Sequence, residues 1–371
     1  MHDIDDPRVW SAAASPKAAE VHALAAASLG AATVEASDRL DADIVLRLRG
    51  LVDADEGEAL AEVFDTAPGA AVYRHLWRLL TRAERAGDGD ALGATVFALP
   101  VVIVAGLAEG ASGTATLPGV LSDPDVLVAL LREHGALAGN RTFALGDALV
   151  DAETLALGQL PRLLARRTLA ATVPAPLDLA PAPIGLAAGH ESVHLRFVVG
   201  VAVAAPGVDL VASASTQGWG IPLTQALGAQ ITVAGTTVLA LPHAPQRLIT
   251  AVQTGRALQR EVSAQVFAGN ALRKFRASVG EPSAVISAHR VAGAPAGGEL
   301  RLSLSSPFEP RDAEGFRCPL YAADRTADVV QMLATLLADC RIGDVRVLPG
   351  VHADRDPATD VPLLFKADAL H

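Results

Sequence analysis

The chain has 371 residues, of which 51% are hydrophobic and 19% are charged. This apolar content excludes a disordered protein, and the length predicts about two domains of roughly 100–200 residues each. The formal net charge of −11 opposes binding to a phosphate backbone, so we expect no nucleic-acid partner.

The N-terminal half, residues 1–171, is predicted to be mainly helical. Val72, Leu76 and Leu79 lie on one side of residues 70–86, and arginines lie on the other side, which is the spacing of an amphipathic helix. The expected helices cover 15–28, 55–64, 70–86, 122–134 and 146–157, and the expected strands cover 43–48 and 96–107.

The start of the chain and its apolar runs predict a cytoplasmic protein. Residues 1–6 are acidic, whereas a secretory leader begins with basic residues. The longest apolar run, residues 96–107, is shorter than the roughly 20 residues of a membrane span and contains a proline. The 2 cysteines form no CxxC pair, so we expect neither a disulfide framework nor a cysteine zinc site.

Residues 172–189 are predicted to link two domains. Pro174, Pro176, Pro181 and Pro183 remove backbone donors and favour an extended path for this segment. The alternative is a strap that lies on one large domain. We place the C-terminal domain at residues 190–371.

The C-terminal half is predicted to be an α+β domain. Expected strands cover 193–205, 209–213, 231–241, 284–291, 300–305 and 345–348, and expected helices cover 222–228, 244–279 and 326–340. From residue 231 to 348 the order is βαββαβ, which predicts a ferredoxin-like unit. Such a unit places both helices on one face of its sheet, so the other face must be covered by another part of the chain or by a second copy.

Residues 190–194 match the HExxH pattern of zinc peptidases. On a helix, this pattern places His190 and His194 about 6 Å apart along the axis on one face, with Glu191 as the general base. The residues that follow have a strand pattern, however, and on a strand the two histidines would lie about 13 Å apart and could not share one ion. We therefore favour a chance match at the start of a strand, with a zinc site as the alternative.

Two other motifs are interpreted as structural. Residues 106–114 follow an apolar strand, as phosphate-binding loops do, but they contain no lysine and lead into no helix, which favours a surface loop. Cys318 could be a reactive thiol with His352 downstream, but no helix N-terminus is evident to lower its pKa. A buried structural cysteine is the favoured interpretation.

Two segments are candidates for contact with a partner. Trp219 lies between two glycines and could be an exposed anchor, because tryptophan contributes strongly to binding. The alternative is a tryptophan that closes the edge of the core. Leu363, Leu364 and Phe365 could dock on a neighbouring chain, with packing on their own domain as the alternative.

These observations favour assembly over catalysis. We expect a non-catalytic cytoplasmic protein without a cofactor, which binds a protein partner or itself and forms a homo-oligomer. The alternative is a metal-dependent hydrolase that holds zinc on His190 and His194 and uses Glu191 as its base.

Only 3 of the 30 basic residues are lysines, a bias typical of a GC-rich bacterial genome.

Overall fold

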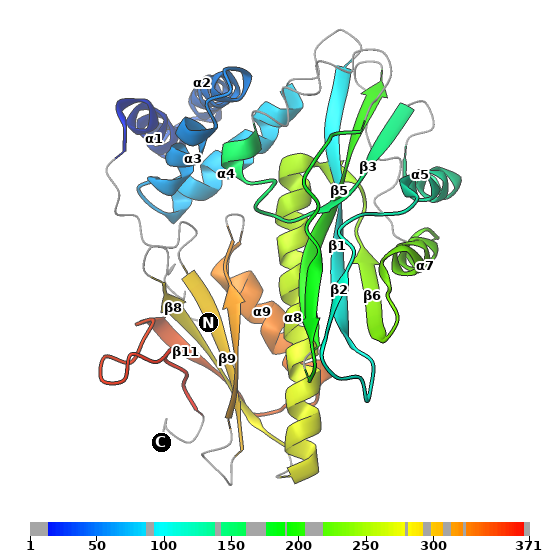
Figure 1. Ribbon diagram of the computed structural model, residues 1–371. Helices are drawn as coiled ribbons and strands as arrows, with labels where there is room; N and C mark the ends of the chain where they lie inside the picture. The colour runs from blue at the N-terminus through cyan, green and yellow to red at the C-terminus, as the bar shows by residue number, and fades with distance from the viewer. Residues whose placement is uncertain are drawn as a thin grey trace. The chain divides into compact units, whose positions relative to one another are not determined.

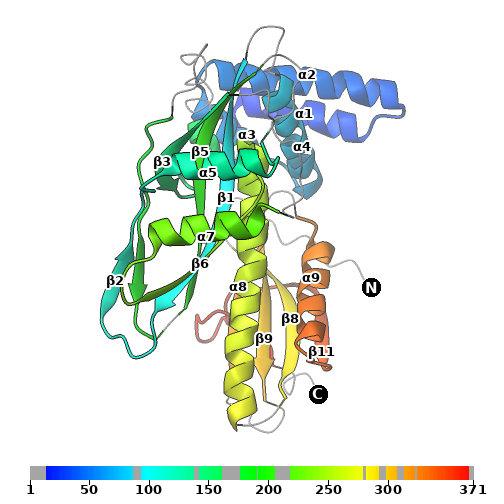
Figure 2. The ribbon, with the colours of Figure 1, turned by 90° about the vertical axis from the view of Figure 1, so that its right-hand side faces the viewer.

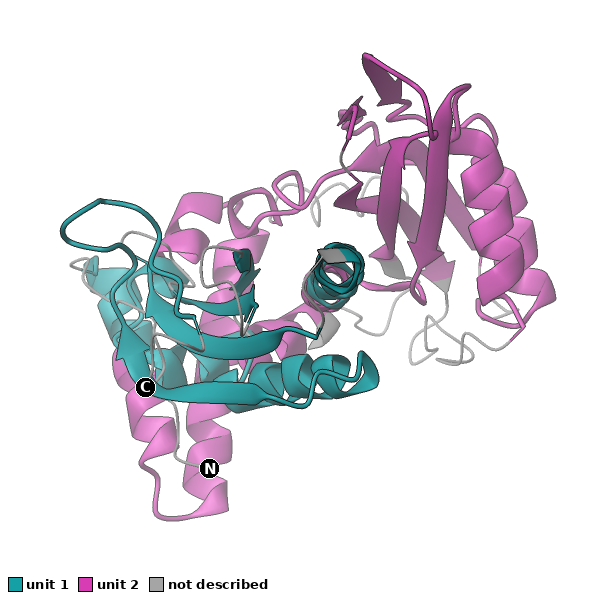
Figure 3. Cartoon of the chain, turned by 90° about the horizontal axis from the view of Figure 1, so that it is seen from below, with its two compact units in different colours: residues 1–22, 63–77, 260–371 teal, residues 23–62, 78–259 magenta. Residues whose placement is uncertain are grey.

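The chain forms two compact units. The computed structural model describes residues 14–86, 93–137, 142–160, 176–189, 191–204, 218–278, 281–291, 298–306, 313–321 and 324–366. Unit 1 comprises residues 1–22, 63–77 and 260–371, and unit 2 comprises residues 23–62 and 78–259 (Figure 3). Across the described residues, no helix combines the length and the hydropathy that a bilayer span requires.

Four helices come first in the described chain. They are α1 (Pro16–Leu29), α2 (Val34–Asp53), α3 (Gly57–Asp65) and α4 (Ala70–Ala86) (Figure 1). The predicted helices at 15–28, 55–64 and 70–86 are thus confirmed. The predicted strand at 43–48 is wrong, because Ile44, Leu48 and Leu51 recur at helical spacing and form one buried side of α2.

An antiparallel sheet forms the centre of unit 2. Its strands lie in the order β3 (Thr142–Val150), β5 (Ser192–Ala204), β1 (Gly93–Leu107) and β6 (Thr236–Pro242), and the short β7 (Gln246–Arg247) also pairs with β1. β1 is central and buried on both faces, which explains its continuous apolar sequence. The predicted helix at 146–157 is wrong, since residues 142–150 form β3 and turns follow, with the short 3₁₀-helix η1 (Leu157–Gln159).

Both faces of this sheet are covered. On one face lie α5 (Pro124–Glu133) and α7 (Gly220–Ile231), side by side in Figure 2, and the ribbon of β2 (Thr114–Leu117) and β4 (Ile184–Ala187) extends the same core. On the other face lies the first part of α8 (Leu248–Ser278). A Cβ at Gly255 of α8 would come within about 3 Å of Leu195 and Phe197 of β5, so glycine allows this close approach.

The predicted linker therefore contains regular structure. Its described part, residues 176–189, lies in unit 2, and β4 within it pairs with β2. Arg196 of β5 holds the segment by donating hydrogen bonds to the carbonyls of Ala182 (2.8 Å) and Pro183 (3.3 Å). A domain boundary at this segment stays a prediction.

Unit 1 contains the second large sheet. Its strands lie in the order β10 (Ala313–Pro319), β9 (Gly298–Ser305), β8 (Ser283–Arg290) and β11 (Val345–His352), and only β11 runs parallel to its neighbour. The second part of α8 and α9 (Thr326–Asp339) pack on one face, where their apolar residues meet those of the strands.

The mixed α+β fold is confirmed, whereas the ferredoxin-like unit is confirmed only in part. The predicted helix at 326–340, the second part of the predicted helix at 244–279 and the strands at 284–291, 300–305 and 345–348 are present in unit 1. The expected first strand is not among them: β6 pairs with β1 in unit 2, with Leu239 opposite Val104. The fourth strand of the sheet is instead β10, which was not predicted.

The other face of this second sheet is polar and yet buried. Arg301 of β9 is 0% exposed and forms ion pairs with Glu299 and Asp354. The same guanidinium donates hydrogen bonds to the carbonyls of Asp354 (2.5 Å) and Leu363 (2.8 Å). Residues 353–366, here called the C-terminal segment, are therefore held against this face by Arg301.

Candidate functional site

The HExxH residues lie at the start of a strand. Glu191 directly precedes β5, and His194 is on β5 itself, as the strand pattern predicted, while His190 lies outside the described residues. His194 Nε2 is 2.8 Å from Ser192 Oγ, and this hydroxyl donates to the Ala105 carbonyl at 3.2 Å. The Nε2 atom of the half-buried His194 therefore has a hydrogen-bond partner on its own strand.

The environment of His194 favours its neutral form. Burial, and then the positive charge of Arg196, lowers the pKa of His194 from its ordinary value. In the described part of the chain, no three His, Cys, Asp or Glu side chains are grouped so that they could hold a metal ion. The zinc hypothesis, with Glu191 as base, gains no support from these contacts and stays a prediction.

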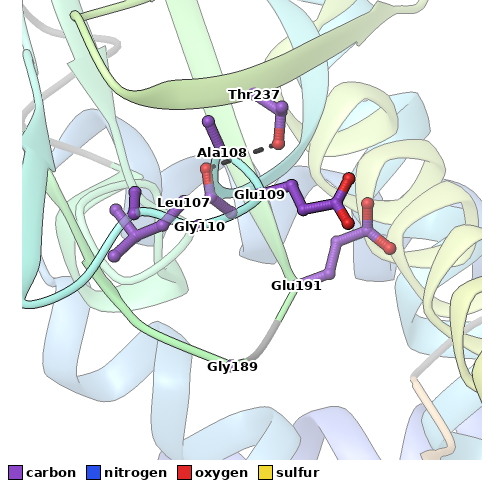
Figure 4. Close-up of a pocket in the computed structure, with 9 residues that line it drawn as sticks. Leu107, Ala108, Glu109, Gly110, Gly189, Glu191 and Thr237 are labelled. Atoms are coloured by element: carbon purple, nitrogen blue, oxygen red, sulfur yellow. Dashed lines mark hydrogen bonds between the residues drawn. The ribbon is translucent and has the colours of Figure 1, made fainter.

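A surface pocket of about 290 Å³ lies where β1 ends and β5 begins. Residues 106–111 line it together with Gly189, Glu191 and Thr237. Figure 4 shows the side chains of Glu109 and Glu191 next to each other, with Thr237 donating a hydrogen bond to the Gly106 carbonyl. Two neighbouring carboxylates repel anions, so this loop is unsuited to a phosphate group.

Cys318 is a core residue. Its side chain packs among the apolar residues between the sheet of unit 1 and its helices, whereas His352 contacts Phe365 (4.7 Å between ring centroids) at the C-terminal segment. Burial raises the pKa of the Cys318 thiol to about 12, against the opposing effect of Arg260. The structure does not bring Cys318 and His352 together as a thiol–imidazole pair.

We therefore expect the two thiols to differ sharply in reactivity. Iodoacetamide at pH 7.5 should label the half-buried Cys340 of the native protein, and it should label Cys318 only after unfolding. Mass spectrometry of peptides from native and urea-unfolded samples measures both. The variant Cys340→Ser is the control, and native labelling of that variant would contradict the inert core position of Cys318.

The residues proposed for partner contact have contacts within their own units, although Leu364 is also 38% exposed. Trp219 is 1% exposed and lies in the core of unit 2, which corresponds to the packing alternative and not to an exposed anchor. In the C-terminal segment, Leu364 lies over Gly315, and the Phe365 ring is 5.9 Å from that of His289. The Leu363 carbonyl accepts a hydrogen bond from Arg301.

The outer edge of β6 offers a different surface, which the sequence analysis missed. Within the described residues, β6 pairs with β1 on one side and with no strand on the other. Leu239 of β6 is 48% exposed, and Thr237 is exposed on the same face of the strand. We call these two residues of β6 the edge surface.

The edge surface lies in a long stretch of sequence that has no charged residues. Residues 210–246 contain no Asp, Glu, Lys or Arg, although 19% of the whole chain is charged, a proportion that would place about seven such residues in this stretch. This gap is the signal by which the sequence could have revealed the surface.

Comparison of the chain with protein-family models, curated proteins and solved structures gives no match.

Proposed function

We propose that this protein acts by self-association, with copies joining along the edge surface of β6. The observation that carries this proposal is that Leu239 is 48% exposed on β6, whose outer side pairs with no strand among the described residues and carries no charged residue. An exposed strand edge presents unpaired N–H and C=O groups, and proteins that stay monomeric usually protect it with charges, prolines, bulges or a covering segment.

The other edges of the two large sheets have such protection. The backbone of residues 119–121 covers the edge of β3 through two 2.7 Å hydrogen bonds, and β3 also has a register shift between Leu145 and Leu149. β11 contains a proline and a register shift, and β10 contains Glu314, Arg317 and a terminal proline. The only proline of β6 is its last residue, Pro242.

Electrostatics favour the same surface. Two copies each carry a formal net charge of −11, so their approach is opposed over most of the surface. At the edge surface no like charges would meet, because neither of its two residues is charged. Burial of Leu239 would in addition remove apolar area from water, at about 25 cal/mol per Å².

We expect the purified protein to form a dimer whose dissociation constant rises about tenfold or more in the variant Leu239→Lys, because the substitution places a positive charge on each copy at the contact. Size-exclusion chromatography with light scattering over a range of concentrations measures this change. The matched control is Val34→Lys, since Val34 is also an exposed apolar residue of unit 2 (73%) but lies on α2.

The proposal fails if the native protein is monomeric at all accessible concentrations. It also fails if Leu239→Lys and Val34→Lys weaken a dimer equally, since the contact would then not involve β6. Far-UV circular dichroism of each variant separates a change in association from a loss of fold.

A further inference from the structure

We infer that the C-terminal segment is an acid-released cover of the sheet of unit 1, and that a proton on His289 releases it. This inference concerns a change within one chain and does not depend on the proposed self-association. Its basis is the set of contacts that joins residues 353–366 to β8 and β9, together with the charges that surround His289.

The C-terminal segment lies at the surface of unit 1. Each of its residues, 353–366, is either half-buried or exposed, whereas His289 and Arg301, which it contacts, are both 0% exposed. Leu363 N donates to the Asp354 carbonyl at 3.1 Å, so the two ends of the segment are joined to each other. The segment can therefore leave the sheet as one piece, because none of its residues is buried in the core.

Two buried side chains hold the segment on the sheet. The Arg301 guanidinium bonds to both ends of the segment, and His289 Nδ1 is 2.8 Å from the Ala353 carbonyl. Because a carbonyl oxygen can only accept a hydrogen bond, Nδ1 carries the proton of the neutral imidazole. The other ring nitrogen, Nε2, then accepts a hydrogen bond from the Ser287 hydroxyl at 2.7 Å. The neutral ring thus has a partner at each nitrogen while the segment is in place.

The charges around His289 balance only while its ring is neutral. The titratable and charged groups that face the ring, or that pair with those that do, are Glu299 and Arg301 of β9, Arg317 of β10, His352 of β11 and Asp354 of the C-terminal segment. The two carboxylates offset the two guanidinium groups, and Arg355 and Asp360 of the segment form a further pair. A proton on His289 adds a positive charge beside the buried Arg301, and departure of the segment is what admits water to that charge.

The direction of the pH effect follows from the two environments of the ring. While the segment is in place, the pKa of His289 is lowered from 6.5 to about 4, mainly by burial and against the opposing effect of the hydrogen bond to Ala353. Once the segment has left, water reaches the ring and the pKa returns toward 6.5. The released form therefore binds a proton that the covered form does not bind, and acid favours release. Between pH 7.5 and pH 4.5 the ratio of released to covered protein should rise by up to about 70-fold.

The experiment is electron paramagnetic resonance of a nitroxide label on the C-terminal segment of the full chain. The label is attached at Val361→Cys in a Cys340→Ser background, because Val361 is 58% exposed and the other cysteine, Cys318, is buried. We expect a restricted spectrum at pH 7.5 and a mobile component at pH 4.5, with an unchanged far-UV circular dichroism signal. Arg301→Met at pH 7.5 calibrates the mobile spectrum, because it lacks the guanidinium that holds the segment.

The variant His289→Asn tests whether this histidine is the trigger. Asparagine does not titrate in this range and keeps a side-chain N–H donor, so the label in this variant should stay restricted at pH 4.5. The matched control His134→Gln removes an exposed histidine of unit 2, and its label should become mobile as in the parent chain.

Three results would overturn the inference. The first is a label that stays restricted at pH 4.5 in the parent chain. The second is a mobile component that appears only together with a loss of the circular dichroism signal, since the chain would then unfold and not release one segment. The third is an acid response of His289→Asn equal to that of His134→Gln, which would assign the trigger to another group.

Discussion

Replacement of Arg301 by methionine is expected to lower the free energy of unfolding of unit 1 by about 3–5 kcal/mol at pH 7. The guanidinium is 0% exposed and contacts the carboxylates of Glu299 and Asp354 and the carbonyls of Asp354 and Leu363. Methionine fills a similar volume but cannot donate hydrogen bonds. Acceptors that are buried without a donor keep their full desolvation penalty. Urea unfolding followed by circular dichroism measures the loss.

The matched control is Arg317→Met. Arg317 also pairs with Glu299, but its side chain is 54% exposed, so its removal should cost at most about 1 kcal/mol. Limited proteolysis adds a local readout, because release of the C-terminal segment in Arg301→Met should make residues 353–366 the first site of cleavage. Equal stability losses in the two variants would show that the burial of Arg301 does not decide its contribution.

The second large effect is a loss of stability when the pH falls from about 6.5 to 4. Burial of His289 lowers its pKa from 6.5 to about 4, with a further lowering by Arg301 and His352, while the hydrogen bond to the Ala353 carbonyl and the charge of Glu299 oppose the change. Between these two pH values the unfolded chain binds a proton at His289 that the folded chain does not bind. Acid therefore favours unfolding, by on the order of 3 kcal/mol at pH 4.

The variant His289→Asn should flatten this part of the pH profile. Asparagine does not titrate, so the difference between its stability at pH 6.5 and at pH 4 should shrink by most of that amount, as measured by urea unfolding at each pH. His194 in unit 2 contributes in the same direction, since its pKa is also lowered. The pKa of Asp151 is lowered from its ordinary value of 3.8, so its contribution to stability is lost mainly below that pH. The exposed His134→Gln is the control, and a profile for His289→Asn as steep as that of the native chain would refute the assignment.

Elements with a long, regular pattern could be predicted from the sequence. The helix at 70–86 coincides with α4, because its apolar residues keep helical spacing over more than four turns, and the apolar run at 96–107 lies within the central strand β1. The shorter pattern at 43–48 was misread as a strand, since alternation over six residues does not distinguish a strand from one side of a helix.

Pairing between strands could not be read from local pattern. The strand that contains β6 was expected, but its partner is β1, about 130 residues earlier, and nothing in residues 236–242 specifies that partner. The same limit applies to the candidate site. The chemistry-bearing residues Glu191, His194 and Cys318 attract attention by their type. The outer side of β6, which no described strand pairs, is recognised only once the neighbours of β6 are known.

The interleaving of the two units has a consequence for the order of synthesis. Unit 1 draws on residues 1–22 and 63–77 and also on residues 260–371, so it cannot be completed until the last part of the chain leaves the ribosome. Unit 2 ends at residue 259 and has all its segments available earlier. In a nascent chain, the apolar residues of α1 and α3 that belong to unit 1 therefore stay unpacked until residues 260–371 have been synthesised. We expect chaperones to bind ribosome-bound chains that are arrested before residue 260.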